Sequence, residues 1–252
     1  MRHTAKTALC YAFAVAFALA GWHITALLLN TPALPTPLET IGVFAKHAQA
    51  LLPDFLTSLG RLAVSLLIGT VLGAPLGLFL GRSRIAGRLF SPVLYILYPL
   101  PKIVILPILL VLFGLGGAPK IALVTITVFF QVVVVMRDAA ASIPDATLLS
   151  VRSLGAGTLA QWRHVVIPAT LPELFTTLRV STSVAIAVLF FSESIAGSTG
   201  LGYFIMNSWA MVNYPRMFAG IIALAALGFA VYVLFDVCER RLTRWRAAGN
   251  KA

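Results

Sequence analysis

The chain has 252 residues, of which 60% are hydrophobic and only 11% charged, and its mean hydropathy is +0.96. A soluble domain carries about a quarter charged residues, so this composition excludes a soluble globular protein and predicts an all-α integral membrane protein. The formal charge of +11 arises from 19 basic and 8 acidic residues, and the basic residues fall mainly between apolar segments. The charge therefore indicates membrane topology rather than a nucleic-acid partner.

The first predicted span covers residues 8–29, an apolar run that follows Arg2 and Lys6. The sequence Ala-Leu-Ala before Gly21 resembles a signal-peptidase site, but the run is long enough to span, and we expect it to be retained. The interval 30–54 contains three prolines and an amphipathic stretch. We expect it to lie outside, along the membrane surface.

The second predicted span, residues 58–80, carries a stripe of small residues at four-residue spacing. The stripe consists of Ser65, Gly69, Gly73, Gly77 and Gly81. Such residues share one face of a helix, where they allow another backbone to approach closely. The stripe predicts helix packing within one subunit, with a subunit contact or a pore lining as the alternative.

The third predicted span, residues 89–115, contains four prolines and Lys102. Each proline removes a backbone donor, so the segment cannot form one straight helix. Broken helices are tolerated at membrane depth where they face protein or a water-filled cavity. An ionisable residue in a span is a functional candidate, so Lys102 is a candidate for the solute pathway. Pairing with backbone carbonyls at a helix break, or snorkelling, is the alternative.

The fourth predicted span, residues 120–136, precedes the one long polar interval between apolar segments, residues 137–172. Pro144-Asp145 predicts the start of a short helix, and Gly155 predicts its left-handed stop. A capping-box spacing at Thr158 predicts a second short helix, which ends before the chain re-enters the membrane.

This polar interval contains several apolar side chains, but it is too short to form a hydrophobic core of its own. They are Leu148, Leu149, Val151, Leu154 and Trp162. They must bury against something, and they predict a docking surface for a soluble partner on the membrane face. The alternative is a solvated connector.

The fifth predicted span, residues 173–195, ends in Ser192, Glu193 and Ser194 beside a glycine-rich turn. These residues are candidates for the translocation path or for supporting an outer gate. A structural hydrogen bond from Glu193 to the turn is the alternative. The sixth predicted span covers residues 216–237.

With six spans and both ends inside, about 14 of the 19 basic residues fall on the inner side and about 4 on the outer side. This bias predicts an N-in/C-in topology and places the interval 137–172 in the cytoplasm.

The interval 137–172 resembles the EAA loop of the permease subunits of binding-protein-dependent ABC importers. The family pattern is Glu-Ala-Ala, three residues, a glycine, nine residues and Ile-x-Leu-Pro. The matching positions are Leu149, Ser150, Val151, Gly155, Val165, Ile167 and Pro168. The spacing agrees throughout, but Leu149 stands where the family has its acidic residue, so a charged contact with the ATPase would be missing there.

Two further stretches resemble permeases for nitrate, taurine and aliphatic sulfonates. They are YPLPKIVILPILLVLFGLG and Glu193 followed by Gly-Leu-Gly-Tyr. The resemblance covers roughly residues 55–245 and implies one permease domain, residues 1–252, in a bacterial inner membrane. It implies a partnership with two ATPase subunits, a second permease copy that makes a homodimer, and an extracytoplasmic binding protein that delivers a small oxyanion. Permeases for pyrimidines or thiamine precursors are related, and such a solute is the alternative.

The chain has no phosphate loop, no paired carboxylates, no nucleophile elbow and no HExxH motif. We therefore expect a protein that is not an enzyme, with no metal or cofactor of its own, and with ATP and Mg bound by the partner ATPase. A secondary transporter that needs no ATPase and a membrane-embedded enzyme are the remaining alternatives. A secondary transporter should hold more ionisable residues in its spans than Lys102 and Glu193. A membrane-embedded enzyme needs a cluster of catalytic groups.

Overall fold

The computed structural model describes residues 2–243, with side chains from Phe13 onward, and that part of the chain is all-helical apart from its turns. The elements are α1 (Arg2–Leu29), α2 (Pro37–Arg82), α3 (Arg84–Leu97), the 3-10 turn η1 (Lys102–Ile105), α4 (Leu106–Phe113), α5 (Ala118–Ala141), α6 (Asp145–Ser153), α7 (Thr158–Gln161), the π-helical turn η2 (Trp162–Val166), α8 (Ile167–Ala196), α9 (Leu201–Ala210) and α10 (Tyr214–Leu242). The predicted all-α class is confirmed.

Four helical segments are long and apolar enough to cross a membrane, namely α2, α5, the run from α7 through α8, and α10. Helix α3 and the segment η1–α4 meet at a bend of 84° and make a fifth span if they are counted as one broken helix. The first predicted span lies in α1, whose side chains are described only over Phe13–Leu29 and which is not among the helices counted above. The count of six and the orientation therefore stay predictions.

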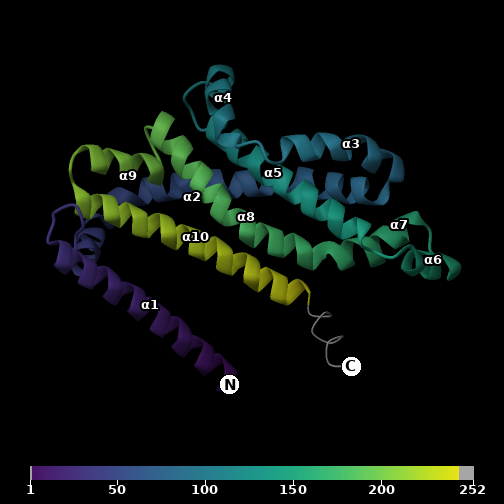
Figure 1. Cartoon of the computed structure of the whole chain (residues 1–252), viewed down its shortest axis with the longest axis horizontal. Helices are drawn as coiled ribbons and strands as arrows, with labels where there is room; N and C mark the ends of the chain where they lie inside the picture. The colour runs from purple at the N-terminus through teal and green to yellow at the C-terminus, as the bar shows by residue number, and fades with distance from the viewer. Residues whose placement is uncertain (1, 244–252) are drawn as a thin grey trace.

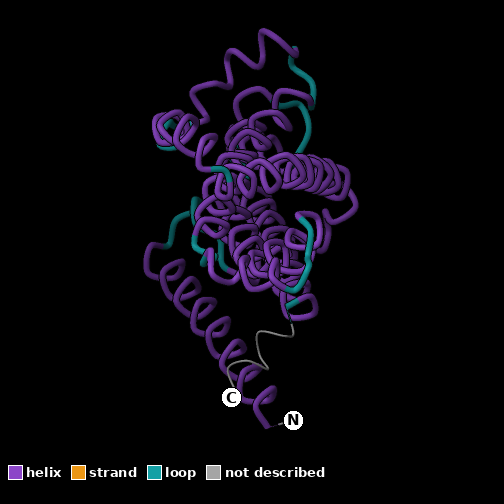
Figure 2. Tube along the Cα trace, turned by 90° about the vertical axis from the view of Figure 1, so that its right-hand side faces the viewer, coloured by secondary structure: helices purple, strands orange, loops and turns teal. Residues whose placement is uncertain are grey.

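Helices α2, α5, α8 and α10 form the body of the molecule, with α5 packed against α2 and α8, and α10 packed against α8, α9 and α2 (Figure 1). Helix α1 stands off from this body in both views and meets it near its C-terminal end (Figures 1 and 2). There the Trp22 indole stacks on Phe218 at 5.5 Å and donates a hydrogen bond to the Pro35 carbonyl at 3.0 Å.

Helix α2 runs for 46 residues without interruption, so it joins most of the interval 30–54 to the second predicted span in one helix. That the interval lies along the membrane surface stays a prediction. Thr36 and Glu39 form a capping box that starts the helix, with each side chain accepting a bond from the backbone N–H of the other. At 1.5 Å per residue, α2 is about 69 Å long, roughly twice the thickness of a bilayer core.

The small-residue stripe of α2 packs against α5 of the same chain, as predicted. The Ser65 hydroxyl lies 3.1 Å from the Ile121 carbonyl oxygen. A Cβ atom at Gly77 would lie 2.5 Å from the Val133 carbonyl oxygen, and one at Gly81 would overlap a backbone oxygen of α5. The two backbones are in contact, which leaves no room for any side chain larger than hydrogen.

The second short helix of the polar interval differs from the prediction. It is not a separate element, because α7 continues through η2 into α8. Pro168 cannot donate to the carbonyl one turn earlier, and the π turn, in which the Ile167 N–H bonds Trp162 O, accommodates this loss. The predicted capping box is also wrong, because Gly157 occupies the N-cap and the Gln161 amide donates to the Ala156 carbonyl instead.

Candidate functional site

The Glu193 carboxylate, near the end of α8, is completely buried and fully partnered. Its Oε1 accepts from the Arg61 guanidinium at 2.7 Å, and Ser58 Oγ lies 3.0 and 2.8 Å from its two oxygens. Its Oε2 also accepts from the Gly202 N–H at 3.0 Å. A buried charge is tolerated only with such partners, so this carboxylate fixes α8 to α2 and to the start of α9.

The same group of residues shapes the glycine-rich turn that follows α8. Arg61 donates to the carbonyl and the hydroxyl of Thr199, each at 2.9 Å, and Asp54 accepts from the Gly200 N–H at 2.7 Å. Gly200 has φ +108°, and a Cβ there would overlap the Glu193 carboxylate. We call Asp54, Ser58, Arg61, Glu193 and Thr199 the Glu193 cluster.

The predicted bond from Glu193 to the glycine-rich turn is confirmed at Gly202. Of the two neighbouring candidates, Ser192 is bonded within its own helix, donating to Leu189 O at 2.8 Å. Ser194 donates to Phe190 O at 2.7 Å and also lies 3.4 Å from the Gly202 carbonyl oxygen at the start of α9. The sequence did not predict the ion pair with Arg61, which lies near the start of the second predicted span and 132 residues from Glu193.

Lys102 lies at the break between α3 and α4, where its ammonium caps the end of α3. Its Nζ donates to the Leu97 carbonyl at 2.8 Å and to the Tyr98 carbonyl, which confirms the predicted pairing at the helix break. The ammonium also lies 5.0 Å from the centre of the Phe130 ring. It borders a cavity of about 430 Å³ between the break, α5 and α8.

Residues 145–166, comprising α6, α7 and η2, form what we call the coupling segment. Leu148 and Trp162 are half-buried and pack on the core. Leu149, Leu154 and Leu159 point away from it, with exposed fractions of 59%, 87% and 82%. The segment therefore presents an apolar surface that this chain does not cover, and Leu159 adds to the predicted set.

The remaining residues of the EAA-like pattern, the last two of which follow the coupling segment at the start of α8, take different positions. Gly155 has φ +87°, so the predicted left-handed stop is confirmed. Ser150 is exposed and bonds the Ala146 carbonyl at 2.9 Å, and Ile167 is 47% exposed. The half-buried residues of the pattern are Val151, Val165 and Pro168.

An arginine at the end of α2 holds the coupling segment in place. Arg82 donates to Asp145 Oδ1 at 2.8 Å and to the Ile143 carbonyl at 3.2 Å. The hydrogen bond and charge of Arg82 hold the pKa of the Asp145 carboxyl below its usual range, with a smaller contribution from Arg84. The start of α6 is thereby tied to the span that carries the small-residue stripe.

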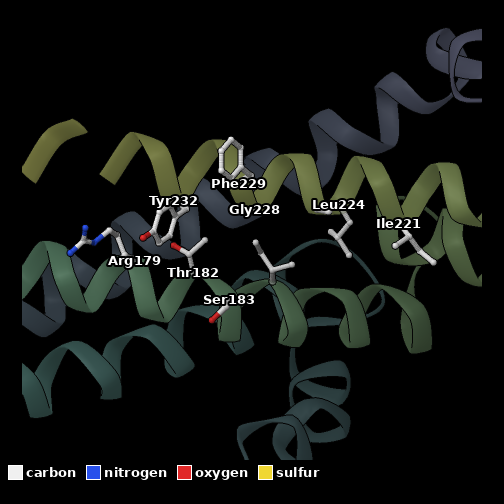
Figure 3. Close-up of a pocket in the computed structure, with 10 residues that line it drawn as sticks. Arg179, Thr182, Ser183, Ile221, Leu224, Gly228, Phe229 and Tyr232 are labelled. Atoms are coloured by element: carbon white, nitrogen blue, oxygen red, sulfur yellow. The ribbon is translucent and has the colours of Figure 1, made fainter. Parts of the chain in front are cut away.

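A second set of charges joins α8 to α10. Arg179 donates to Asp236 and pairs with Glu239, both at 2.9 Å. Figure 3 shows Arg179 and Tyr232 at one end of an apolar groove of about 600 Å³ between these two helices. The groove is otherwise lined mainly by aliphatic residues, which suits contact with lipid.

Residues 69–244 match the family model described as the binding-protein-dependent transport system inner membrane component. The chain belongs to this family. It is therefore a multi-pass membrane component of an ABC importer, a family that works with an ATPase and a solute-binding protein. This membership favours the importer interpretation over a secondary transporter or a membrane-embedded enzyme.

Several curated relatives are similar over most of the chain. The taurine transport system permease protein TauC of Escherichia coli is 27% identical over 232 residues, covering 89% of this chain and 84% of the relative. The putative aliphatic sulfonates transport permease protein SsuC of Bacillus subtilis is 29% identical, covering 90% and 84%. The formylaminopyrimidine transport permease protein ThiX of Halalkalibacterium halodurans is 26% identical, covering 89% and 91%.

A solved structure of the MetNI methionine ABC transporter, in an inward-facing conformation, has the same fold. Its matching chain superposes with a TM-score of 0.64 at 24% identity, covering 77% of this chain and 96% of that one.

Proposed function

We propose that this chain is the permease subunit of an ATP-driven importer in a bacterial inner membrane. Two copies form the solute pathway as a homodimer, and two cytoplasmic ATPase subunits each receive one coupling segment. The observation that carries the proposal is the exposed apolar surface of Leu149, Leu154 and Leu159 on the coupling segment of a family member. ATP and Mg belong to the ATPase, and an extracytoplasmic binding protein delivers the solute.

The continuity of α7, η2 and α8 gives this proposal its mechanism. Closure of the ATPase dimer around ATP would draw the two coupling segments together. Because α7, η2 and α8 form one helical run, a displacement at Leu159 passes directly into the span that carries Glu193. Arg179 binds α8 to Asp236 of α10, so both helices respond together.

The proposed solute is a small organic sulfonate such as taurine. The names of TauC and SsuC support this class, and nitrate is a further candidate because its single negative charge matches that of a sulfonate group. ThiX, at similar identity, makes a formylaminopyrimidine the second candidate. Uptake of labelled taurine into vesicles, with ethanesulfonate, nitrate and a formylaminopyrimidine as competitors, separates these classes.

The coupling role is tested by changing Leu149, Leu154 and Leu159 together to serine. The matched control is Leu38→Ser, an equally exposed leucine (80%) at the opposite end of α2 from Arg82. Purified from its native membrane in mild detergent, the wild type and the control should bring along a subunit with a phosphate loop.

The triple variant should lose that subunit, and Gly155→Pro should lower solute-stimulated ATPase activity by misaligning the two short helices. A chain that purifies alone, yet moves solute into vesicles without ATP, would refute the proposal.

A further inference from the structure

The cavity beside the broken span has the size and the lining of a small-molecule site. Its volume of about 430 Å³ lies within the range of roughly 300–1,000 Å³ that is typical of ligand pockets. Tyr98, Phe130 and Phe191 give it aromatic walls, while Lys102, Thr127 and Gln131 supply its polar atoms. It lies between the break and helix α8, so it borders the span that continues from the coupling segment.

The charge of this cavity is uncompensated. The Lys102 ammonium has three N–H donors, and the hydrogen bonds found for it go to two backbone carbonyls, those of Leu97 and Tyr98. No acidic residue lines the cavity, and Lys102 forms no ion pair within the described residues. A cation at membrane depth is unfavourable without a counter-charge, and an anionic solute would provide one.

A second polar group in the same lining needs a donor. Gln131 Oε1 is buried and has no hydrogen-bond donor in the described part of the chain. A buried acceptor without a partner is destabilising, and a ligand N–H or O–H would satisfy it. Gln131 and Tyr98 also border an adjoining cavity of about 240 Å³ that includes Glu173, so the region beyond Gln131 contains an acidic side chain.

We propose that this cavity is where the permease holds its solute in passage, and that it selects a small molecule with an oxyanion at one end and a hydrogen-bond donor at the other. Lys102 would bind the oxyanion, Gln131 would accept from the donor, and Phe130 would cover the short aliphatic part. An aminosulfonate such as taurine has this pattern, whereas a neutral pyrimidine offers nothing to the ammonium. The inference rests on the proposed importer function and assigns its solute site.

The test uses the full permease–ATPase complex in vesicles with its binding protein, and it measures initial uptake of labelled taurine and of ethanesulfonate, which lacks the amine. Lys102→Gln should lower uptake of both solutes by about 10-fold to 100-fold, the range expected for a lost hydrogen bond to a charged group. Lys102→Arg keeps the charge and should retain most uptake. Gln131→Leu should lower uptake of taurine and leave that of ethanesulfonate nearly unchanged.

Two lysine controls separate a solute contact from a structural role. Lys46 is exposed on α2, and Lys46→Gln removes a positive charge away from the cavity, so uptake should stay at the wild-type rate. Lys120 also caps backbone carbonyls, those of Leu115, Gly116 and Ala196, but does not line this cavity. Lys120→Gln should lower the yield of folded complex without changing the ratio of taurine to ethanesulfonate uptake.

The outcomes are distinct. If the wild type takes up sulfonates and Lys102→Gln takes them up equally well, the site assignment is overturned while the importer function stands. The same holds if Gln131→Leu lowers uptake of both solutes in equal proportion. If the wild type takes up the pyrimidine and no sulfonate, the proposed solute class is wrong, and the selectivity for an oxyanion assigned to this cavity is wrong with it.

Discussion

Replacing Glu193 by glutamine tests whether the Glu193 cluster holds the middle of α2, the end of α8 and the start of α9 together. The variant keeps the size of the side chain and removes its charge, which leaves the Arg61 guanidinium, only 10% exposed, without a counter-ion. Breaking a buried ion pair in this way lowers stability by about 3–5 kcal/mol. We expect about 3 kcal/mol, because Arg61 keeps its two bonds to Thr199 and glutamine can still accept from Ser58.

At roughly 2–4 °C per kcal/mol for a chain of this size, the midpoint of thermal unfolding in detergent should fall by about 6–12 °C. The double variant Arg61→Met with Glu193→Gln should lose less than the sum of the single variants, with a coupling energy of about 2 kcal/mol. Ser192→Ala, which removes a bond within α8 alone, is the control and should lose about 1 kcal/mol or less. Strict additivity of the two single variants, or an unchanged midpoint for Glu193→Gln, would refute the reasoning.

Two further predictions concern other contacts. Gly77→Ala places a Cβ 2.5 Å from the Val133 carbonyl oxygen and should destabilise the α2–α5 pair by about 1–3 kcal/mol. The control Gly42→Ala, whose added Cβ has nothing within 4 Å, should not destabilise the protein. Equal midpoints of thermal unfolding for the two variants would contradict this prediction. Because Arg82 lowers the pKa of Asp145, the pair contributes stability above the unfolded pKa of about 4, and that contribution is lost as the pH falls through the lower folded value. Asp145→Asn should abolish this acid dependence, as measured by proteolysis of the coupling segment between pH 7 and pH 3.

The sequence predicted the helical class, the packing stripe and the broken span because each follows from local chemistry. Four-residue spacing is a property of one helix, and prolines act on their own turn. The left-handed conformation predicted for Gly155 is confirmed, because it too depends on the local sequence. Helix α2 begins at Pro37, well before the span 58–80 that hydropathy defined, and α7 continues into α8, which the capping-box spacing at Thr158 does not indicate. The Thr36–Glu39 capping box, visible in the sequence, marks the true start of α2.

The Glu193 cluster could not be predicted from local sequence patterns, because it joins residues that are far apart in the sequence. Arg61 lies 132 residues from Glu193, and no periodicity links the two. One signal was present, because Arg61 stands four residues before Ser65 and so shares the face of the small-residue stripe. A charged residue on a face that is otherwise shaped for close packing must be buried beside that packing, and a buried arginine requires an acidic partner.

That shared face has a mechanical consequence for an importer. Arg61 binds the Glu193 cluster and Arg82 binds Asp145 of the coupling segment, and both arginines belong to α2, about 32 Å apart along its axis. Between them the glycine stripe holds α2 against α5 with backbone contacts, so these two helices can slide or bend little relative to one another. The end of α8 is therefore fixed to the same rigid pair that anchors the start of the coupling segment, while the other end of that segment continues into α8. A displacement of the coupling segment must then be absorbed within α8 itself, and the π turn beside Pro168 and the buried Pro172 are the two places where its hydrogen-bond ladder is already interrupted.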